Sequence, residues 1–140
     1  MANQKIIGFT AGTFDMFHIG HLNLLRNARS RCDYLIVGVN SDRLVQEYKG
    51  KRVVIPLEER MEIVRSLRFV DEVLEVDSLD KKISWNQRHY DLLFIGDDWK
   101  GNLRWEATAK EMEQFGVKTI FLPHTEGTNS TLLREKLIDY

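Results

Sequence analysis

Hydrophobic residues gather in five short, nearly continuous runs that are separated by segments of mixed polarity. Each run is rich in Ile, Val, Leu, Phe or Tyr and is too short for a stable helix. Strands that are covered on both faces, as in a parallel sheet, have this near-continuous apolar character. The runs predict five strands, at residues 5–10, 33–39, 71–76, 91–96 and 117–122.

Helical patterns lie between these strands. Leu22, Leu25 and Ala28 form one apolar stripe, and Pro56 is followed by two glutamates, which suit the positive end of a helix dipole. The predicted helices span residues 21–31, 56–68, 79–89, 104–115 and 129–138.

The alternation of strands and helices predicts an α/β fold, a Rossmann-like, doubly wound parallel five-stranded sheet. No linker, repeat or shift in composition divides the chain, and 140 residues with 43% hydrophobic content suit one core. We therefore expect a single domain over residues 1–140. Ligands of such sheets bind beyond the carboxyl ends of the strands, so the chemistry is expected just after each strand.

The charge balance and the cysteine count limit the partners. The chain has 20 Lys and Arg against 21 Asp and Glu, a formal net charge of -1, whereas nonspecific binding of DNA or RNA needs a surplus of basic side chains. Cys32 is the only cysteine, which excludes an intrachain disulfide and zinc sites built from several cysteines. There is no signal-peptide profile and no run of 18 apolar residues. We expect no nucleic-acid partner, no membrane association and a cytoplasmic location.

The turn after the first strand combines glycines with histidines. Gly12 and Gly20 remove side chains where the backbone turns and where the helix starts, so the N–H groups there can form an anion site. His18 and His21 are three residues apart and can face one side of a helical turn. The spacing is neither GxGxxG nor GxxxxGK[ST]. We expect the two imidazoles to donate hydrogen bonds to phosphate oxygens.

Two other interpretations of the histidines stay open. They can simply cap the helix, which is the commoner role of an isolated histidine, or they can bind zinc with Asp15 as a third ligand. The coincidence of a strand, a glycine-rich turn, an aspartate and two histidines favours phosphate binding.

The same segment resembles the signature of the cytidylyltransferase family, GTFD at residues 12–15 followed by HxGH at 18–21. Residues 68–73, 96–99 and 124–131 match the family in the same order, and together they are most similar to the glycerol-3-phosphate cytidylyltransferases. The HxGH motif alone marks a broader superfamily that includes adenylyltransferases.

The resemblance implies roles for particular residues. Lys49 matches a family lysine that contacts the triphosphate, so the implied catalytic residues are His18, His21 and Lys49. The implied nucleotide-binding residues are Thr10, Gly12, Thr13, Phe14, Gly20, Asp97, Trp99, Thr125, Gly127, Ser130 and Thr131. The implied acceptor-binding residues are Asp15, Arg60, Arg68, Lys81 and Asp98.

Two later segments also contain candidate ligand-binding residues. Asp97 and Asp98 could hold Mg²⁺ or accept hydrogen bonds from ribose or the acceptor. Ser130 and Thr131 start the last predicted helix and could form a second anion cradle. The expected cofactor is Mg²⁺, or another divalent cation, held mainly by the phosphates of the nucleotide.

We therefore expect a nucleotidyltransferase that moves CMP from CTP to a small phosphorylated alcohol, with glycerol 3-phosphate as the first candidate. ATP as the donor and phosphocholine as the acceptor are alternatives. An alternative of another class is a nucleotide-binding regulatory module without catalysis. His124 and Asn129 stand where the relatives have arginine and serine, which bears mainly on the choice of acceptor. The relatives also imply a homodimer.

Overall fold

The sheet is continuous and entirely parallel in the computed structural model, which describes residues 4–96 and 103–123. Its strand order is β3-β2-β1-β4-β5. The strands are β1 (Ile7–Gly12), β2 (Tyr34–Asn40), β3 (Glu72–Val76), β4 (Leu92–Ile95) and β5 (Lys118–Phe121). All five predicted strands are confirmed, each beginning one or two residues later than the sequence suggested.

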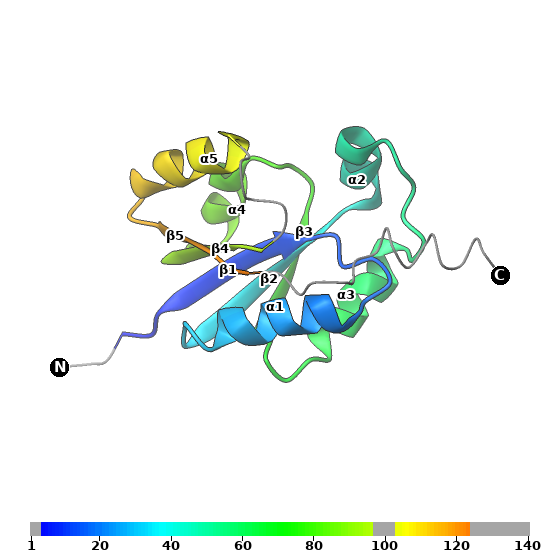
Figure 1. Cartoon of the computed structure of the whole chain (residues 1–140), viewed down its shortest axis with the longest axis horizontal. Helices are drawn as coiled ribbons and strands as arrows, with labels where there is room; N and C mark the ends of the chain where they lie inside the picture. The colour runs from blue at the N-terminus through cyan, green and yellow to red at the C-terminus, as the bar shows by residue number, and fades with distance from the viewer. Residues whose placement is uncertain (1–3, 97–102, 124–140) are drawn as a thin grey trace.

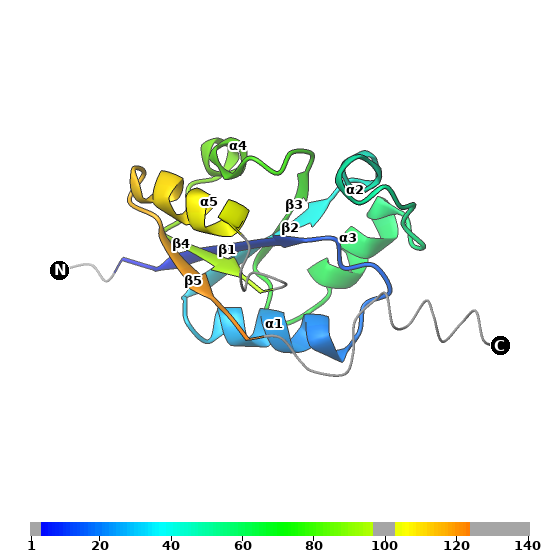
Figure 2. The ribbon, with the colours of Figure 1, turned by 45° about the horizontal axis from the view of Figure 1, so that its top comes forward.

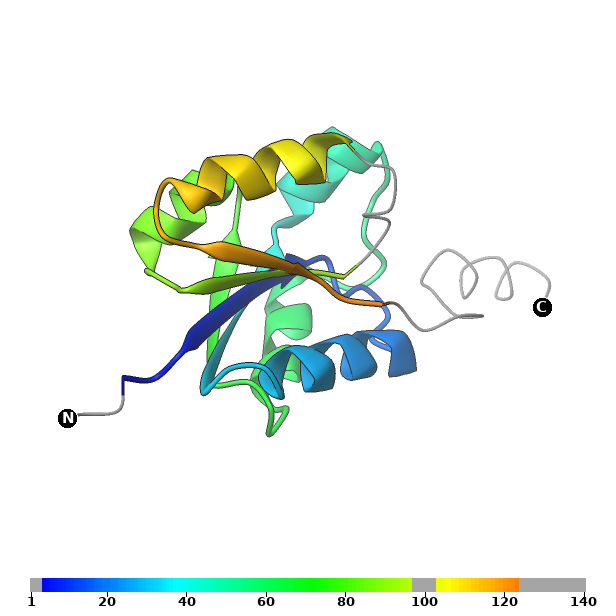
Figure 3. The same ribbon diagram turned by 60° about the vertical axis from the view of Figure 1, so that its left-hand side comes forward.

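Helices cover both faces of this sheet. They are α1 (Ile19–Arg29), α2 (Asp42–Lys49), α3 (Leu57–Arg65), α4 (Lys81–Gln87) and α5 (Leu103–Glu113). Figure 1 shows α1 and α3 against one face and α2, α4 and α5 against the other, and Figures 2 and 3 show the same two layers from other sides. The predicted doubly wound α/β architecture is confirmed. The helix predicted at residues 129–138 lies outside the described residues.

Side chains of β2 show why the strands are apolar along their whole length. Leu35, Val37 and Val39 pack in the core beneath α1 and α3, whereas Ile36 packs in the core beneath α2, α4 and α5. Successive side chains of a strand point to opposite faces, so a sheet that is covered twice needs apolar residues at both.

Two helices differ from the prediction. The segment that became α2 was expected to be part of a connection, but Ser41 caps it by accepting the N–H of Leu44 at 3.1 Å. Gly50 ends it with φ 65, the left-handed conformation of a helix C-cap. Helix α1 begins two residues earlier than expected, so His18 is its N-cap and the histidine pair belongs to its first turn.

The sheet order places the chemistry at the end of β1. This strand pairs with β2 on one side and with β4 on the other, so the chain changes direction across the sheet here. Ligands of open α/β sheets bind at this switch point, beyond the carboxyl ends of the strands. Within residues 4–96 and 103–123, no helix has the length and apolar character needed to span a membrane.

Candidate active site

The paired histidines form a capping box at the start of α1. The N–H of Gly20 donates to Nδ1 of His18 at 3.0 Å, and the N–H of His18 donates to Nδ1 of His21 at 3.2 Å. A ring nitrogen that accepts carries no hydrogen, so each imidazole holds its hydrogen on Nε2. The rings are stacked, with centroids 3.8 Å apart and planes 25° apart. Two Nε2–H donors therefore stand side by side at a helix N-terminus.

Burial keeps His21 uncharged. Phe14 and Phe17 lie 5.4 Å and 5.2 Å from its ring, centroid to centroid. Burial lowers the pKa of His21 to about 3, electrostatic interactions with His18 and Lys49 lower it further, and Asp15 opposes the shift. A neutral imidazole still donates one hydrogen bond, and its pKa can rise when an anion arrives.

The turn that carries the histidines has a strained backbone. Phe14 and Met16 have φ values of 53 and 50, a left-handed conformation that is uncommon for residues other than glycine. Phe14 is held there because its ring is buried in the core. A Cβ atom on Gly12 would lie 3.1 Å from that ring, so the close approach requires a glycine. Strained backbone of this kind is typical of functional turns.

Asp15 and Arg60 stabilise the turn between β1 and α1 through hydrogen bonds to backbone groups. Both oxygens of the Asp15 carboxylate accept backbone N–H groups, from Val54 at 2.8 Å and from Ile55 at 2.9 Å. The Arg60 guanidinium is fully buried and donates to the carbonyls of Ile55 and Thr13, both at 2.7 Å.

Arg60 also joins two further elements to the turn. It donates to the carbonyl of Asn40 at 2.8 Å and pairs with the carboxylate of Asp42. The groups of Asp15 and Arg60 that would contact the acceptor are bonded to backbone groups of the protein. The predicted contacts of both residues with the acceptor stay predictions.

Three other predicted site residues lie near the carboxyl edge of the sheet, in different surroundings. Thr10 is 1% exposed and its hydroxyl donates to the carbonyl of Phe94 at 3.0 Å, which ties β1 to β4. Thr13 follows β1 and is half-buried. Lys49 is exposed at the end of α2, with its ammonium 5.6 Å from the centroid of the Tyr48 ring. The structure thus brings Thr13 and Lys49 toward the histidines, and it adds Tyr48, which the sequence did not single out.

Lys81 is a buried cation at the same edge of the sheet. It is the first residue of α4, which follows β3, and is 5% exposed. Its ammonium lies 5.5 Å from the centroid of the Trp105 ring, and the Arg104 guanidinium lies 5.4 Å from the same centroid. Burial lowers the pKa of Lys81 to about 8, helped by Arg104 and opposed by Asp80.

Arg68 is not brought to this site. It is exposed in the turn between α3 and β3, and therefore lies at the amino end of β3, on the opposite edge of the sheet. The other predicted site residues lie outside the described residues: Asp97, Asp98, Trp99, Thr125, Gly127, Ser130 and Thr131.

The zinc interpretation of the histidines gains no support. In the part of the chain that the structure describes, no group of three or more His, Cys, Asp or Glu side chains could hold a metal ion. Asp15, the proposed third ligand, instead directs both oxygens to backbone N–H groups.

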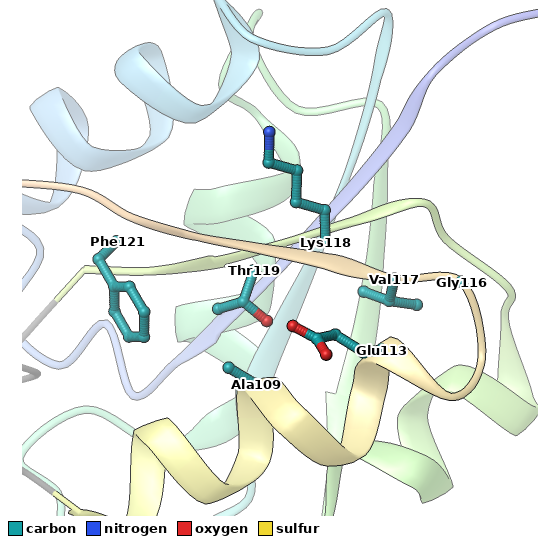
Figure 4. A pocket seen from close by; sticks show the side chains of 7 residues that line it. All are labelled: Ala109, Glu113, Gly116, Val117, Lys118, Thr119 and Phe121. Carbon is teal, nitrogen blue, oxygen red and sulfur yellow. The ribbon is translucent and has the colours of Figure 1, made fainter.

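A cavity of about 500 Å³ lies elsewhere, between α5 and β5 (Figure 4). Among the described residues, Glu113 and Lys118 are its only charged lining residues, and no described histidine lines it. The described lining residues are Ala109, Glu113, Gly116, Val117, Lys118, Thr119 and Phe121. None of these belongs to the predicted site, and in Figure 4 the Lys118 side chain points away from the Glu113 carboxylate, which would repel a phosphate, so we place the chemistry at the histidine pair.

Comparison with known proteins identifies the family. The sequence profile described as cytidylyltransferase-like matches residues 9–136, which include the histidine pair. The chain belongs to the cytidylyltransferase-like family. The resemblance noted in the sequence is confirmed, and this cytidylyltransferase-like protein is a nucleotidyltransferase.

Several relatives match the cytidylyltransferase-like protein along most of its length. It is 37% identical over 135 residues to the glycerol-3-phosphate cytidylyltransferase of Bacillus spizizenii, covering 96% of this chain and 97% of the relative. It is 36% identical to the ethanolamine-phosphate cytidylyltransferase of Dictyostelium discoideum, covering 98% of this chain and 39% of that protein. Among solved structures, the lipopolysaccharide core biosynthesis protein of Thermoplasma volcanium superposes with a TM-score of 0.74 at 20% identity, covering 89% of this chain and 100% of that one. That similarity shows the fold alone.

Proposed function

We propose that this cytidylyltransferase-like protein transfers CMP from CTP to glycerol 3-phosphate, giving CDP-glycerol and pyrophosphate. The observation that carries the proposal is the stacked pair of His18 and His21, which presents two Nε2–H donors at the switch point of the sheet. The identity to a glycerol-3-phosphate cytidylyltransferase over nearly its full length supports the choice of nucleotide and acceptor.

The reaction needs no covalent enzyme intermediate. A phosphate oxygen of the acceptor attacks the α-phosphorus of CTP in line and forms a new P–O bond. The bond from that phosphorus to the oxygen shared with the β-phosphorus breaks, and pyrophosphate leaves. Catalysis of this step consists of positioning and of stabilising the charge that develops on the phosphate oxygens.

The side chains around the turn fit these tasks. In this proposal His18 and His21 donate to oxygens of the α- and β-phosphates, and the turn at Gly12 and Thr13 lies beside the triphosphate. Lys49 stands near enough to influence the charge of His21 and adds a positive charge that can follow the leaving group. Neutral donors at a helix N-terminus avoid burying two cations in the empty site.

Lys81 is our candidate for the phosphate of the acceptor. It is a nearly buried ammonium at the same edge of the sheet, and among the described residues it lies near the Trp105 ring, the Arg104 cation and the Asp80 carboxylate, whose opposing effect on the pKa is the smallest of the three causes. A buried positive charge with this surrounding is costly unless an anion accompanies it. Contacts of the acceptor with Arg68 and Asp98 stay predictions.

No step is assigned to a metal ion. Mg²⁺ or another divalent cation would bind chiefly to the phosphates of CTP, and Asp97 and Asp98, which lie outside the described residues, stay candidate ligands. The homodimer and the cytoplasmic location also stay predictions.

A pyrophosphate-release assay tests the function. CTP and ATP are each combined with glycerol 3-phosphate, phosphocholine and phosphoethanolamine. We expect release only with CTP, and fastest with glycerol 3-phosphate. Release with ATP would favour the adenylyltransferase alternative, and tight CTP binding without release would favour a regulatory module. His21→Ala should lower kcat about 10²- to 10³-fold, as for loss of an oxyanion donor. His89→Ala is its matched control, because His89 precedes β4 at the opposite edge of the sheet.

A further inference from the structure

The hydroxyl of Tyr48 joins three segments at the edge of the candidate site. It lies 3.3 Å from Oγ1 of Thr13, in the turn after β1. Nδ2 of Asn40, the last residue of β2, donates to Oη of Tyr48 at 3.2 Å and to Oγ1 of Thr13 at 3.4 Å. Three polar side chains from the turn, from β2 and from α2 thus form one closed hydrogen-bonded triad.

The positions of the hydrogens in the triad determine the direction of the Thr13 O–H bond. The amide nitrogen of Asn40 can only donate, so both hydroxyl oxygens accept from it. Either hydroxyl can donate in the Thr13–Tyr48 pair. When Tyr48 donates, Thr13 Oγ1 accepts twice and uses both of its lone pairs. Its own hydrogen is then directed away from the triad. A nucleotide phosphate beside the turn selects this arrangement, because an anion can only accept.

The ring of Tyr48 has a second contact. The ammonium of Lys49 lies 5.6 Å from its centroid, close enough for a cation–π interaction. Tyr48 also packs against the buried cluster that includes Phe9, Leu44 and Val76. The ring is therefore a fixed platform for a lysine that is otherwise exposed.

Arg60 stabilises the same turn from the opposite face of the sheet. It donates to the backbone carbonyls of Thr13 and Asn40, the two residues whose side chains meet Tyr48. Arg60 belongs to α3 and Tyr48 to α2, and these helices cover opposite faces (Figure 2). Arg60 fixes the backbone, which leaves the side-chain hydroxyl of Thr13 to be fixed by Tyr48.

We propose that Tyr48 is a positioning residue of the nucleotide site, whose hydroxyl directs the Thr13 O–H toward a nucleotide phosphate and whose ring holds Lys49 beside it. The proposal rests on the proposed function in one respect, since it takes the anion at this turn to be a nucleoside triphosphate.

Tyr48→Phe removes the hydroxyl and keeps the ring. We expect the KM for CTP to rise about three- to tenfold and kcat to stay within about twofold, because one hydrogen bond to bound nucleotide is weakened. In a Thr13→Ala background the same change should have little further effect, because the group that Tyr48 directs is gone. Tyr48→Leu also removes the platform of Lys49 and should lower kcat as well.

Tyr34→Phe is the matched control. The Tyr34 hydroxyl donates to Glu72 at 2.9 Å, and Tyr34 lies at the amino end of β2, so its loss should leave both constants unchanged. A Tyr48→Phe protein with wild-type KM for CTP would overturn the proposal. So would effects of Tyr48→Phe and Thr13→Ala that simply add, which is the result expected of a structural role alone.

Titration of CTP by calorimetry separates this proposal from the proposed function. If wild-type protein binds CTP without transferring CMP, the function is wrong, while weaker binding by Tyr48→Phe still supports the positioning role. If it transfers CMP and Tyr48→Phe is indistinguishable from it in affinity, only the positioning role is wrong. Wild-type protein that binds neither CTP nor ATP would overturn both.

Discussion

His21 accepts the backbone N–H of His18 on Nδ1 at 3.2 Å, and so closes a capping box in which both side chains are imidazoles. Ser or Thr usually occupies the N-cap of such a box, and Glu or Gln the third helical position. Histidine satisfies the same backbone groups with Nδ1 and keeps a hydrogen on Nε2. Helix capping and phosphate binding, which are alternatives for a lone histidine, are thus compatible here.

His18→Asn should separate these two roles. Asparagine is among the best N-cap residues, so the melting temperature should stay at or above that of the wild type. Its side chain cannot place a donor where Nε2 of His18 stands, so kcat should fall about 10²- to 10³-fold, as for loss of an oxyanion donor. Thermal unfolding and pyrophosphate release measure the two effects. Full turnover by this variant would contradict the assigned role, and His89→Asn controls for loss of a histidine elsewhere.

His21→Gln should change the acid stability of the protein. The native pKa of His21 is about 3, below its ordinary value of 6.5, so between these values the unfolded chain binds a proton that the native protein excludes. The free energy of unfolding therefore falls as the pH is lowered through this window, and is unaffected by this group above it. Glutamine can keep the capping hydrogen bond and does not titrate. Urea unfolding at pH 7, 6 and 5 should show a flatter decline for this variant, and an unchanged decline would contradict the burial of a neutral His21.

Much of the fold could be predicted because burial on both faces leaves a plain signal. The strand β2 is apolar from Tyr34 to Val39, and a run of this length between helical patterns has few other interpretations. Helix α2 was missed because it is short and buries only Leu44 and Val45. Its signals were the caps at its two ends, Ser41 and Gly50, and an apolar face of Leu44, Val45 and Tyr48 that spans little more than one turn.

The site could be predicted only where its chemistry is local in sequence. Gly12, His18 and His21 lie within one turn, so their spacing alone indicated an anion site. The role of Arg60 could not be predicted, because it depends on carbonyl groups of distant segments that the fold brings together. The same holds for Tyr48, whose partners are 35 and 8 residues away.

Arg60→Met should unfold much more easily than the wild type. Methionine retains the buried stem, but it leaves the carbonyls of residues 13, 40 and 55 without their donor inside the protein. We expect a loss of about 3–5 kcal/mol in the free energy of unfolding, because each buried acceptor left unsatisfied costs about 1–3 kcal/mol. Arg65→Met is the control, because Arg65 lies on the same helix in an exposed pair with Glu62, and such pairs contribute at most about 1 kcal/mol. Equal urea midpoints for the two variants would show that the network does not hold the turn.

Lys81 should give the affinity for the acceptor a dependence on pH. Its pKa of about 8 means that the ammonium loses its proton above this pH in the free protein. A phosphate binds the charged form, so the KM for glycerol 3-phosphate should be constant below pH 8 and should rise above it, by up to about tenfold per pH unit.

Lys81→Arg keeps the positive charge throughout this range and should flatten the rise. Lys82→Arg is the control, since the neighbouring Lys82 is paired with Asp80 and Glu111 at the surface and should keep the wild-type profile. Initial rates at pH 7 to 9.5 measure the profiles, and a rise that persists in Lys81→Arg would show that another group binds the phosphate of the acceptor.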